Sequence, residues 1–290
     1  TMISINTNYG GIFAAKASSQ ATLRVDQAME RLSTGKRINH ARDDSAGQAI
    51  ATRLAAEIEG LAMASRNVAD GQSLVDTAES ALVETHALLL RMREISVQAA
   101  NGTLSTADNT ALNAEFQQLV AEIDRISDNT SWAGTKLLNG DSTGATSTSA
   151  TFAFQAGVNN TTADTISVDI SNADAATLGI FDDSTTPGTN DITLTNATNA
   201  GAAIVAVDAA IAAVSTERGK LGAVSNRMSS TMANLDQITV NLTASKGRIE
   251  DADFAAETGN LAKGQILQQA ATAMLAQANA SKQQVLTLIR

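Results

Sequence analysis

The stretch of sequence that decides the fold is LAMASRNVADGQSLVDTAESALVETHALLLRM, residues 61–92. Within it, small and apolar residues recur at alternating steps of three and four positions. The positions in this series are Leu61, Ala64, Val68, Gly71, Val75, Ala78, Leu82, Thr85, Leu89 and Met92. A repeat of 3.5 residues is typical of the buried seam of a coiled coil, so we expect a long helix that packs against another helix.

A second seam of the same period lies in the C-terminal part of the chain. It comprises Val207, Ile211, Val214, Leu221, Met228, Met232, Leu235, Leu242 and Ile249, with Arg218, Ser225, Thr239 and Lys246 as polar interruptions. The two seams predict a mainly α fold, in which a long antiparallel coiled-coil rod is built from both ends of the chain.

Helix-ending signals divide the N-terminal part into a helix over about 8–33 and a second over about 45–100. SAGQ at 45–48 predicts a capping box of Ser45 and Gln48, and STAD at 105–108 is a variant of one. Asn101 and Gly102 are expected to stop the second helix. At 1.5 Å per residue that helix would span roughly 80 Å, which is too long for a compact globule.

The middle of the chain, residues 141–199, has a different composition. It is dominated by Ser, Thr, Asn and Asp and contains neither Lys nor Arg. TFAFQAGV and DTISVDI alternate apolar and polar residues between turn formers, and they predict two short strands paired as a hairpin. DITLT at 191–195 is a weaker candidate for a third strand.

Composition excludes several classes of function. The formal net charge of −10 argues against nucleic acid and anionic membranes as partners, because both require clustered Lys and Arg. The chain has no cysteine, so disulfides and Cys nucleophiles are excluded. No apolar run approaches the eighteen or so residues of a membrane span. TMISINTNYG lacks the features of a secretory signal, so we expect no cleaved one.

Residues that could support catalysis are few. His40 lies near Asp43 and Asp44, but helix capping explains this pattern better than a metal site does. His86 follows a seam position and is expected to be a partly buried or surface helix residue. The sequence has no HExxH, no Gly-rich phosphate loop and no Ser nucleophile elbow. We therefore expect neither an enzyme nor a cofactor.

The two ends of the chain are expected to form amphipathic helices, each only weakly stable on its own. Large apolar residues are spread along residues 1–34 and 255–290, with alanine between them. Pairing the two ends gives only a thin two-helix coil, with apolar sides left uncovered. This surface predicts polymerisation, and head-to-tail contacts between identical subunits would give an open helical filament.

The chain closely resembles bacterial flagellin. The resemblance rests on SINTN, RLSTGKRINHARDDSAGQAIATR, RNVADGQSLVDTAESAL, LLRMREISVQAANGT and GTKLLNG in the N-terminal part. In the C-terminal part it rests on GKLGAVSNRM, RIEDADFAAET, QILQQAATAMLAQAN and VLTLIR. It implies a structural subunit that polymerises into the bacterial flagellar filament for swimming motility.

The resemblance also implies a domain organisation and a route of export. Residues 1–44 with 247–290 would form the inner core of the filament, 45–180 with 190–246 a helical rod domain with the hairpin, and 181–189 a short outer loop. Monomers would be disordered at both ends until assembly. They would pass unfolded through the flagellar type III export channel, escorted by an export chaperone, and would meet filament cap and hook-junction proteins outside the cell.

Three groups of residues carry expected roles. Packing in the filament core is expected of Phe13, Leu23, Leu32, Leu261, Leu267, Met274, Leu275, Val285 and Leu288. By resemblance, Arg91, Ile95 and Glu115 align with the family's contact surface for a vertebrate toll-like receptor. Also by resemblance, a region for O-glycosylation is formed by Ser142, Thr143, Thr146, Ser147, Thr148 and Ser149.

Three other functions are weighed against the filament subunit. A hook–filament junction protein shares the terminal motifs, but VQAANGT and MLAQAN are usually weaker in that group. A chemoreceptor-like signalling bundle would need a membrane span. A flagellin-like surface adhesin could use the Thr-rich middle segment, and this role is compatible with a filament.

Overall fold

The computed structural model describes residues 7–140, 149–181 and 192–288, with side chains up to residue 281. Within these residues the helices are α1 (Tyr9–Thr34), α2 (Ser45–Ala99), α3 (Thr106–Asn129), α4 (Ala197–Glu250) and α5 (Phe254–Leu288). The strands are β1 (Ser131–Trp132), β2 (Thr135–Lys136), β3 (Ser149–Gln155) and β4 (Thr165–Ser171). The predicted fold class, mainly α with long antiparallel helices and a small β-hairpin, is confirmed.

The chain divides into two compact units. The terminal unit comprises residues 1–58 and 240–290, and the central unit comprises residues 59–239. Helices α2 and α4 each contribute residues to both units. The domains drawn from the sequence have their boundaries instead after residues 44 and 246, and they stay a prediction.

The core of the central unit lies along the seam between α2 and α4. Every predicted seam position of α2 from Leu61 to Met92 is buried. On α4, Val207, Val214, Leu221, Met228 and Leu235 are buried as predicted. Three contacts show that the helices are antiparallel, because the α4 partner moves back along the chain as the α2 residue advances. These are Gln72–Ser229 at 3.5 Å, Glu79–Arg218 at 2.8 Å and Arg93–Asp208 at 2.6 Å.

Helix α3 covers a second face of α2. Its own buried face contains the aromatic ring of Phe116 together with Val120 and Ile123. The predicted capping box is present at its start, where the Ser105 hydroxyl accepts from Asp108 N–H at 3.2 Å and the Asp108 carboxylate accepts from Ser105 N–H at 3.0 Å. Where α3 lies along α2, the central unit therefore consists of three helices rather than two.

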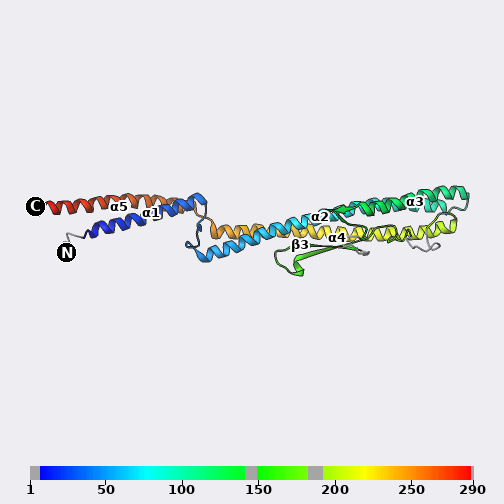
Figure 1. The fold of residues 1–290 in the computed structure, drawn as a ribbon, viewed down its shortest axis with the longest axis horizontal. Helices are drawn as coiled ribbons and strands as arrows, with labels where there is room; N and C mark the ends of the chain where they lie inside the picture. Colours follow the sequence, from blue (N-terminus) through cyan, green and yellow to red (C-terminus); the bar gives the residue numbers. More distant parts are fainter. Residues whose placement is uncertain (1–6, 141–148, 182–191, 289–290) are drawn as a thin grey trace. The chain divides into compact units, whose positions relative to one another are not determined.

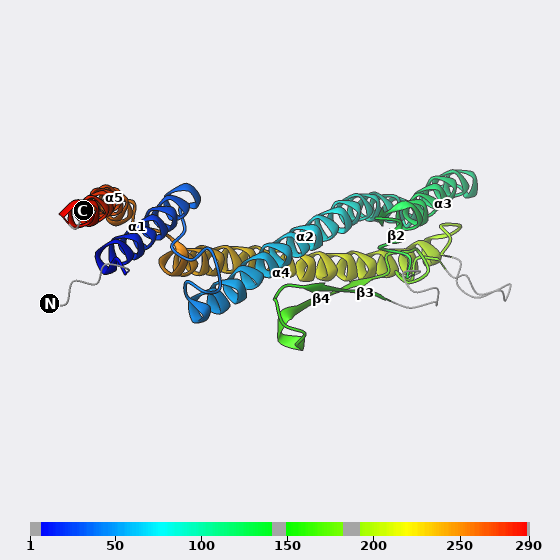
Figure 2. The ribbon, with the colours of Figure 1, turned by 60° about the vertical axis from the view of Figure 1, so that its left-hand side comes forward.

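The β-hairpin lies beside α2 and α4, as Figures 1 and 2 show. Strands β3 and β4 pair antiparallel from Ser149↔Ser171 to Gln155↔Thr165, which confirms the predicted hairpin. Ile166, Val168 and Ile170 alternate with exposed residues and are buried. Glu217 of α4 holds the end of β4, because its carboxylate accepts from both the N–H and the hydroxyl of Ser171 at 3.0 Å.

The prediction of a third strand at 191–195 is wrong for the residues that the structure describes. Residues 192–195 form no strand. Their backbone bonds to side chains of α3 instead: Leu194 N–H donates to Asn113 Oδ1 at 2.9 Å, and Gln117 Nε2 donates to the Ile192 carbonyl at 3.2 Å. The buried Leu194 side chain anchors the segment, so the apolar residue in this pattern reflects packing rather than pairing.

The cap of α2 also differs from the prediction. Asp44 takes this role in place of Ser45, since its carboxylate accepts from Gly47 N–H at 2.9 Å. This hydrogen bond, against a smaller opposing effect of desolvation, lowers the pKa of Asp44. A carboxylate suits the site because the N-terminus of a helix carries partial positive charge.

By length and composition alone, α4 is long and apolar enough to cross a membrane. No such segment was expected from the sequence, because α4 contains many alanines but no unbroken apolar run. One helix of this kind is weak evidence, since core helices pass the same test. Packing against α2 accounts for its buried seam residues.

Candidate functional site

The candidate site is the pair formed by α1 and α5 in the terminal unit, which Figure 1 shows lying side by side. The buried face of α1 consists of small residues and one valine: Gly11, Ala14, Ala21, Val25 and Ala28. On α5 the backbone approaches closely at Gly264, where an added Cβ would lie 2.8 Å from a Val25 methyl group. The seam is therefore narrow, and it leaves little room for large side chains between the helices.

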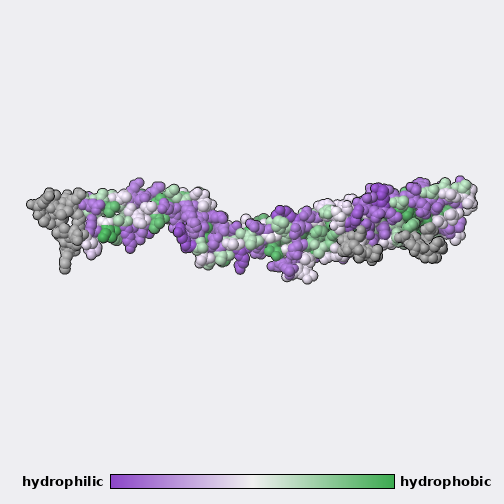
Figure 3. Space-filling view, viewed as in Figure 1, coloured by the Kyte–Doolittle hydropathy of each residue, from purple (hydrophilic) through white to green (hydrophobic). Residues whose placement is uncertain are grey.

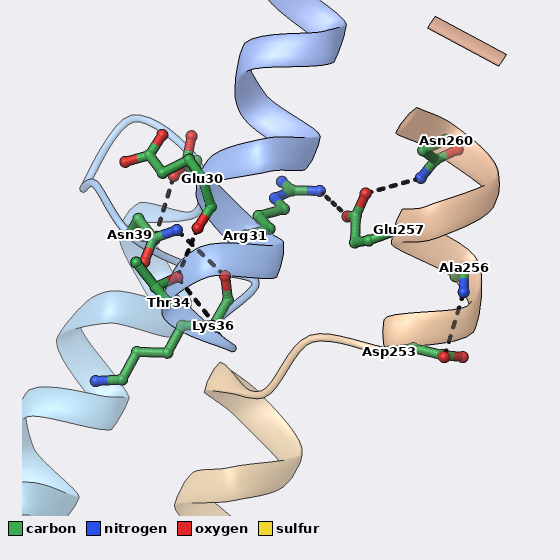
Figure 4. Close-up of polar contacts among 10 residues, drawn as sticks. Glu30, Arg31, Thr34, Lys36, Asn39, Asp253, Ala256, Glu257 and Asn260 are labelled. Atoms are coloured by element: carbon green, nitrogen blue, oxygen red, sulfur yellow. Dashed lines mark hydrogen bonds and ion pairs between the residues drawn. The ribbon is translucent and has the colours of Figure 1, made fainter. Parts of the chain in front are cut away.

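Polar contacts fix the register of the antiparallel pair. Gln268 Nε2 donates to the Thr22 hydroxyl at 3.1 Å in the middle. At the connector end, Arg31 Nη1 donates to Glu257 at 2.7 Å, and Asn260 donates to the other oxygen of the same carboxylate at 3.0 Å (Figure 4). Desolvation raises the pKa of Glu257, but the bonds from Arg31 and Asn260 outweigh it, so the net pKa is lowered. Glu257 is thus held as a carboxylate.

The two connectors next to this pair are bonded to each other. Residues 35–44 join α1 to α2, and residues 251–253 join α4 to α5. Arg37 N–H donates to the Glu250 carbonyl at 2.6 Å, and Ala252 N–H donates to the Gly35 carbonyl at 2.9 Å. A β-bridge between Lys36 and Asp251 lies between these bonds.

Large apolar side chains lie outside the narrow seam. Phe13 is 77% exposed and Met274 is 64% exposed, and Leu23 and Leu267 are also exposed. Figure 3 shows apolar patches on the visible face of this pair. Phe13, Leu267 and Met274 line an apolar groove of about 440 Å³ between the helices. A contiguous apolar surface of this kind is typical of an interaction site.

The other residues predicted to pack in a filament core lie at the edges of the same pair. Leu32, Leu261 and Leu275 are half-buried. Val285 and Leu288 belong to α5, but their side chains lie outside the described residues. Within one chain, small residues and Val25 fill the seam, so four of the seven predicted residues whose side chains the structure describes are exposed.

The predicted receptor residues fall into two groups. Arg91 and Glu115 are exposed and paired, with Arg91 Nη2 at 2.8 Å from Glu115 Oε1. The hydrogen bond to Glu115 raises the pKa of Arg91 further above its usual range. Ile95, by contrast, is only 1% exposed. Its side chain lies beneath the surface of the isolated chain, and a receptor contact through Ile95 stays a prediction. Leu90, 45% exposed, is the apolar residue presented beside Arg91.

The predicted glycosylation region lies mostly outside the described residues. Ser142, Thr143, Thr146, Ser147 and Thr148 belong to the segment that the structure does not describe. Ser149 is the exposed first residue of β3.

The residues around His40 form hydrogen bonds within the connector between α1 and α2. Asp43 accepts N–H bonds from Asn39 at 3.3 Å and His40 at 3.0 Å, and the bond from His40 is the main cause of its lowered pKa. His40 Nε2 lies 2.8 Å from Glu30 Oε1. Among the described residues, no group of three or more His, Asp or Glu side chains could hold a metal ion. The capping interpretation is confirmed for Asp44, which accepts from Gly47 N–H at the start of α2, whereas Asp43 bonds within the connector.

Comparison with known proteins shows which family the chain belongs to. The model of the bacterial flagellin N-terminal helical region matches residues 5–143, and that of the C-terminal helical region matches residues 204–289. The chain belongs to the bacterial flagellin family. It is therefore a subunit that assembles into the flagellar filament, an extracellular appendage, as the resemblance implied.

Curated relatives match over nearly their whole length. The flagellin of Halalkalibacterium halodurans is 46% identical, and the match covers 91% of both chains. The flagellin of Bacillus subtilis is 42% identical over 99% of both. A solved structure assigned to a flagellar hook-associated protein from Vibrio parahaemolyticus covers 72% of this chain with a TM-score of 0.56. At 17% identity it shows a shared fold alone. The hook-junction alternative is not favoured, because the matching family models and these curated relatives are flagellins.

Proposed function

We propose that the exposed apolar faces of α1 and α5 form the inner core of the filament, where they pack against the same helices of neighbouring subunits. The observation that carries this proposal is the combination of an alanine-lined seam within the chain and large side chains such as Phe13 and Met274 outside it. Burying a large apolar side chain contributes about 1.5–3 kcal/mol, so contact between subunits would stabilise the pair strongly.

Electron microscopy of the purified protein, concentrated or seeded with filament fragments, tests this proposal. We expect helical filaments, and hydrogen exchange should show amides of α1 and α5 that are protected in filaments but not in monomers. Amides of the central seam, such as those of Leu82 and Leu89, should be protected in both. Helical ends that are already fully protected in a monomer that never polymerises would contradict the proposal.

Family membership alone leads us to propose further partners and a route of secretion. The partners are an export chaperone, the filament cap and hook-junction proteins, and secretion would occur without cleavage of a signal peptide. The structural role of the family also leads us to propose that the chain acts without catalysis. Mass spectrometry of subunits from native filaments tests the route, because a signal cleaved from the N-terminus of the translated protein would contradict it.

We also propose that the surface around Arg91 and Glu115 contacts a vertebrate toll-like receptor. The exposed Arg91–Glu115 pair and the adjacent Leu90 support this proposal, because a charged pair beside an apolar side chain is a common arrangement at interfaces. Arg91→Ala should raise the half-maximal concentration for reporter-cell signalling by roughly tenfold or more, as for an interface hot spot.

Arg93→Ala is the matched control for this surface. Arg93 is also exposed and ion-paired, but its partner Asp208 lies on α4. Equal effects of the two substitutions, or none from Arg91→Ala, would exclude a specific contact through Arg91.

A further inference from the structure

A polar pocket of about 240 Å³ lies between α1 and α5, next to the close approach at Gly264. Arg24 and Arg31 reach it from α1, one above the other at a spacing of seven residues. Lys263 and Glu257 reach it from α5. This pocket was not predicted from the sequence, because its two walls come from opposite ends of the chain. Of its lining, only Leu267 was assigned a role, in core packing.

The pocket has more positive than negative charge. Its single carboxylate, Glu257, is already bonded to Arg31 and Asn260. Among the described side chains, Arg24 and Lys263 have no ion-pair partner. The Nε atom of Arg31 is buried and has no hydrogen-bond partner within the described residues. Three cations against one acid leave the pocket with a net charge of +2, which attracts an anionic group.

The excess of positive charge extends over the pair as a whole. Helices α1 and α5 together contain five Lys and Arg against three Asp and Glu, a net charge of +2. The complete chain has a net charge of −10. A second copy of this chain is therefore a rich source of carboxylates, and the α1–α5 pair is the part that these carboxylates would approach most favourably.

One carboxylate of α1 is placed to fill the pocket of another copy. Asp26 is exposed, and it has no ion-pair partner among the described residues. It is two positions from both Arg24 and Ala28, which line the pocket. At about 100° per residue, Asp26 thus points to nearly the opposite side of α1, at almost the same level along the helix axis.

We propose that the pocket of one subunit receives the Asp26 carboxylate of a second copy of this chain. An acid on one side of α1 and a cationic pocket on the other form a heterologous contact, which repeats from subunit to subunit instead of closing into a dimer. The proposal rests on the filament function and names one of its lateral contacts.

Charge substitutions in the full-length chain test this contact. Asp26→Asn should raise the critical concentration for assembly by roughly three- to tenfold, the range expected for an interfacial ion pair. Asp236→Asn removes the same charge from an exposed position of α4 and should change it less than about twofold. Asp26→Lys should assemble less well than Asp26→Asn, because a cation then faces the cationic pocket.

Rescue separates a contact from a general effect of charge. Arg24→Glu with Lys263→Glu should impair assembly on its own, and adding Asp26→Lys should restore most of it. Failure of that rescue would overturn the proposal, provided that the wild-type chain polymerises and each variant retains the melting temperature of the central unit. If wild type forms no filament at all, the filament function fails instead.

A free anion gives a different result. If Asp26→Asn assembles like wild type, and inorganic phosphate lowers the critical concentration of both, the pocket binds a free oxyanion and the proposal is wrong. Under the proposal, raising the NaCl concentration weakens wild-type assembly more than assembly of Asp26→Asn, because salt screens an ion pair that the variant lacks.

Discussion

A chain truncated after Ala270 is expected to form no filaments, even when it is seeded, while its central unit unfolds at the wild-type temperature. The deletion removes the part of α5 that faces the start of α1, where Asn8 Nδ2 donates to Asn279 Oδ1 at 3.2 Å. It also removes Ala271 and Met274, which line the apolar groove opposite Phe13. The central unit, residues 59–239, contains none of the deleted residues.

Electron microscopy and a thermal melt followed by circular dichroism measure the two halves of this expectation. Met274→Leu and Met274→Glu are matched point variants in the full-length chain. The leucine variant should assemble, because it keeps an apolar side chain of similar volume in the groove, and the glutamate variant should not. Normal filaments from the truncated chain would refute the role assigned to the α1–α5 pair.

Phe116→Ala is expected to have the largest effect on the stability of the central unit. Phe116 is 0% exposed and is the largest of the fully buried side chains. Truncation of a buried phenylalanine usually lowers the free energy of unfolding by about 3–5 kcal/mol, through lost apolar burial and the cavity that remains. Against a typical total of about 5–15 kcal/mol, this loss is large enough to shift the unfolding midpoint clearly.

Urea unfolding of the monomer, followed by helical circular dichroism, measures this effect. Leu90→Ala is the matched control, because Leu90 lies on α2 and is exposed; its substitution should cost less than about 1 kcal/mol. Equal costs for the two substitutions would show that α3 does not pack as a core helix.

Much of the fold could be predicted from local pattern. The seam from Leu61 to Met92 could be predicted because a 3.5-residue repeat lies within the sequence of a single helix and requires no knowledge of its partner. The hairpin could be predicted because Ile166, Val168 and Ile170 alternate with polar residues. The Ser105 capping box likewise depends on residues three positions apart.

Other features depend on contacts between distant parts of the chain, and local pattern could not give them. Ile95 was placed on a contact surface by resemblance alone. Its side chain is 1% exposed, and the Arg91–Glu115 ion pair shows that α3 lies along this part of α2. Residues 192–195 resemble a strand, but the side chains of Asn113 and Gln117 take their backbone bonds.

The candidate site was predicted in kind but not in detail. Apolar residues at both chain ends predicted a surface in need of partners, and Phe13 and Met274 are indeed exposed. The pattern did not show that small residues would fill the seam, since that depends on the register between α1 and α5. The cationic pocket depends on the same register, because Arg31 and Glu257 are separated by most of the chain.

The paired connectors have a mechanical consequence. Tension applied along the chain at α1 or α5 must pass through one of the two connectors, whose backbone is irregular. Without bonds between them, each connector would extend independently. The hydrogen bonds from Arg37 to Glu250 and from Ala252 to Gly35 clamp the two connectors together. The two connectors must then lengthen together, so a pulling force is divided between both segments of the backbone. The bonded connectors would therefore share a pulling force that would otherwise act on one of them alone.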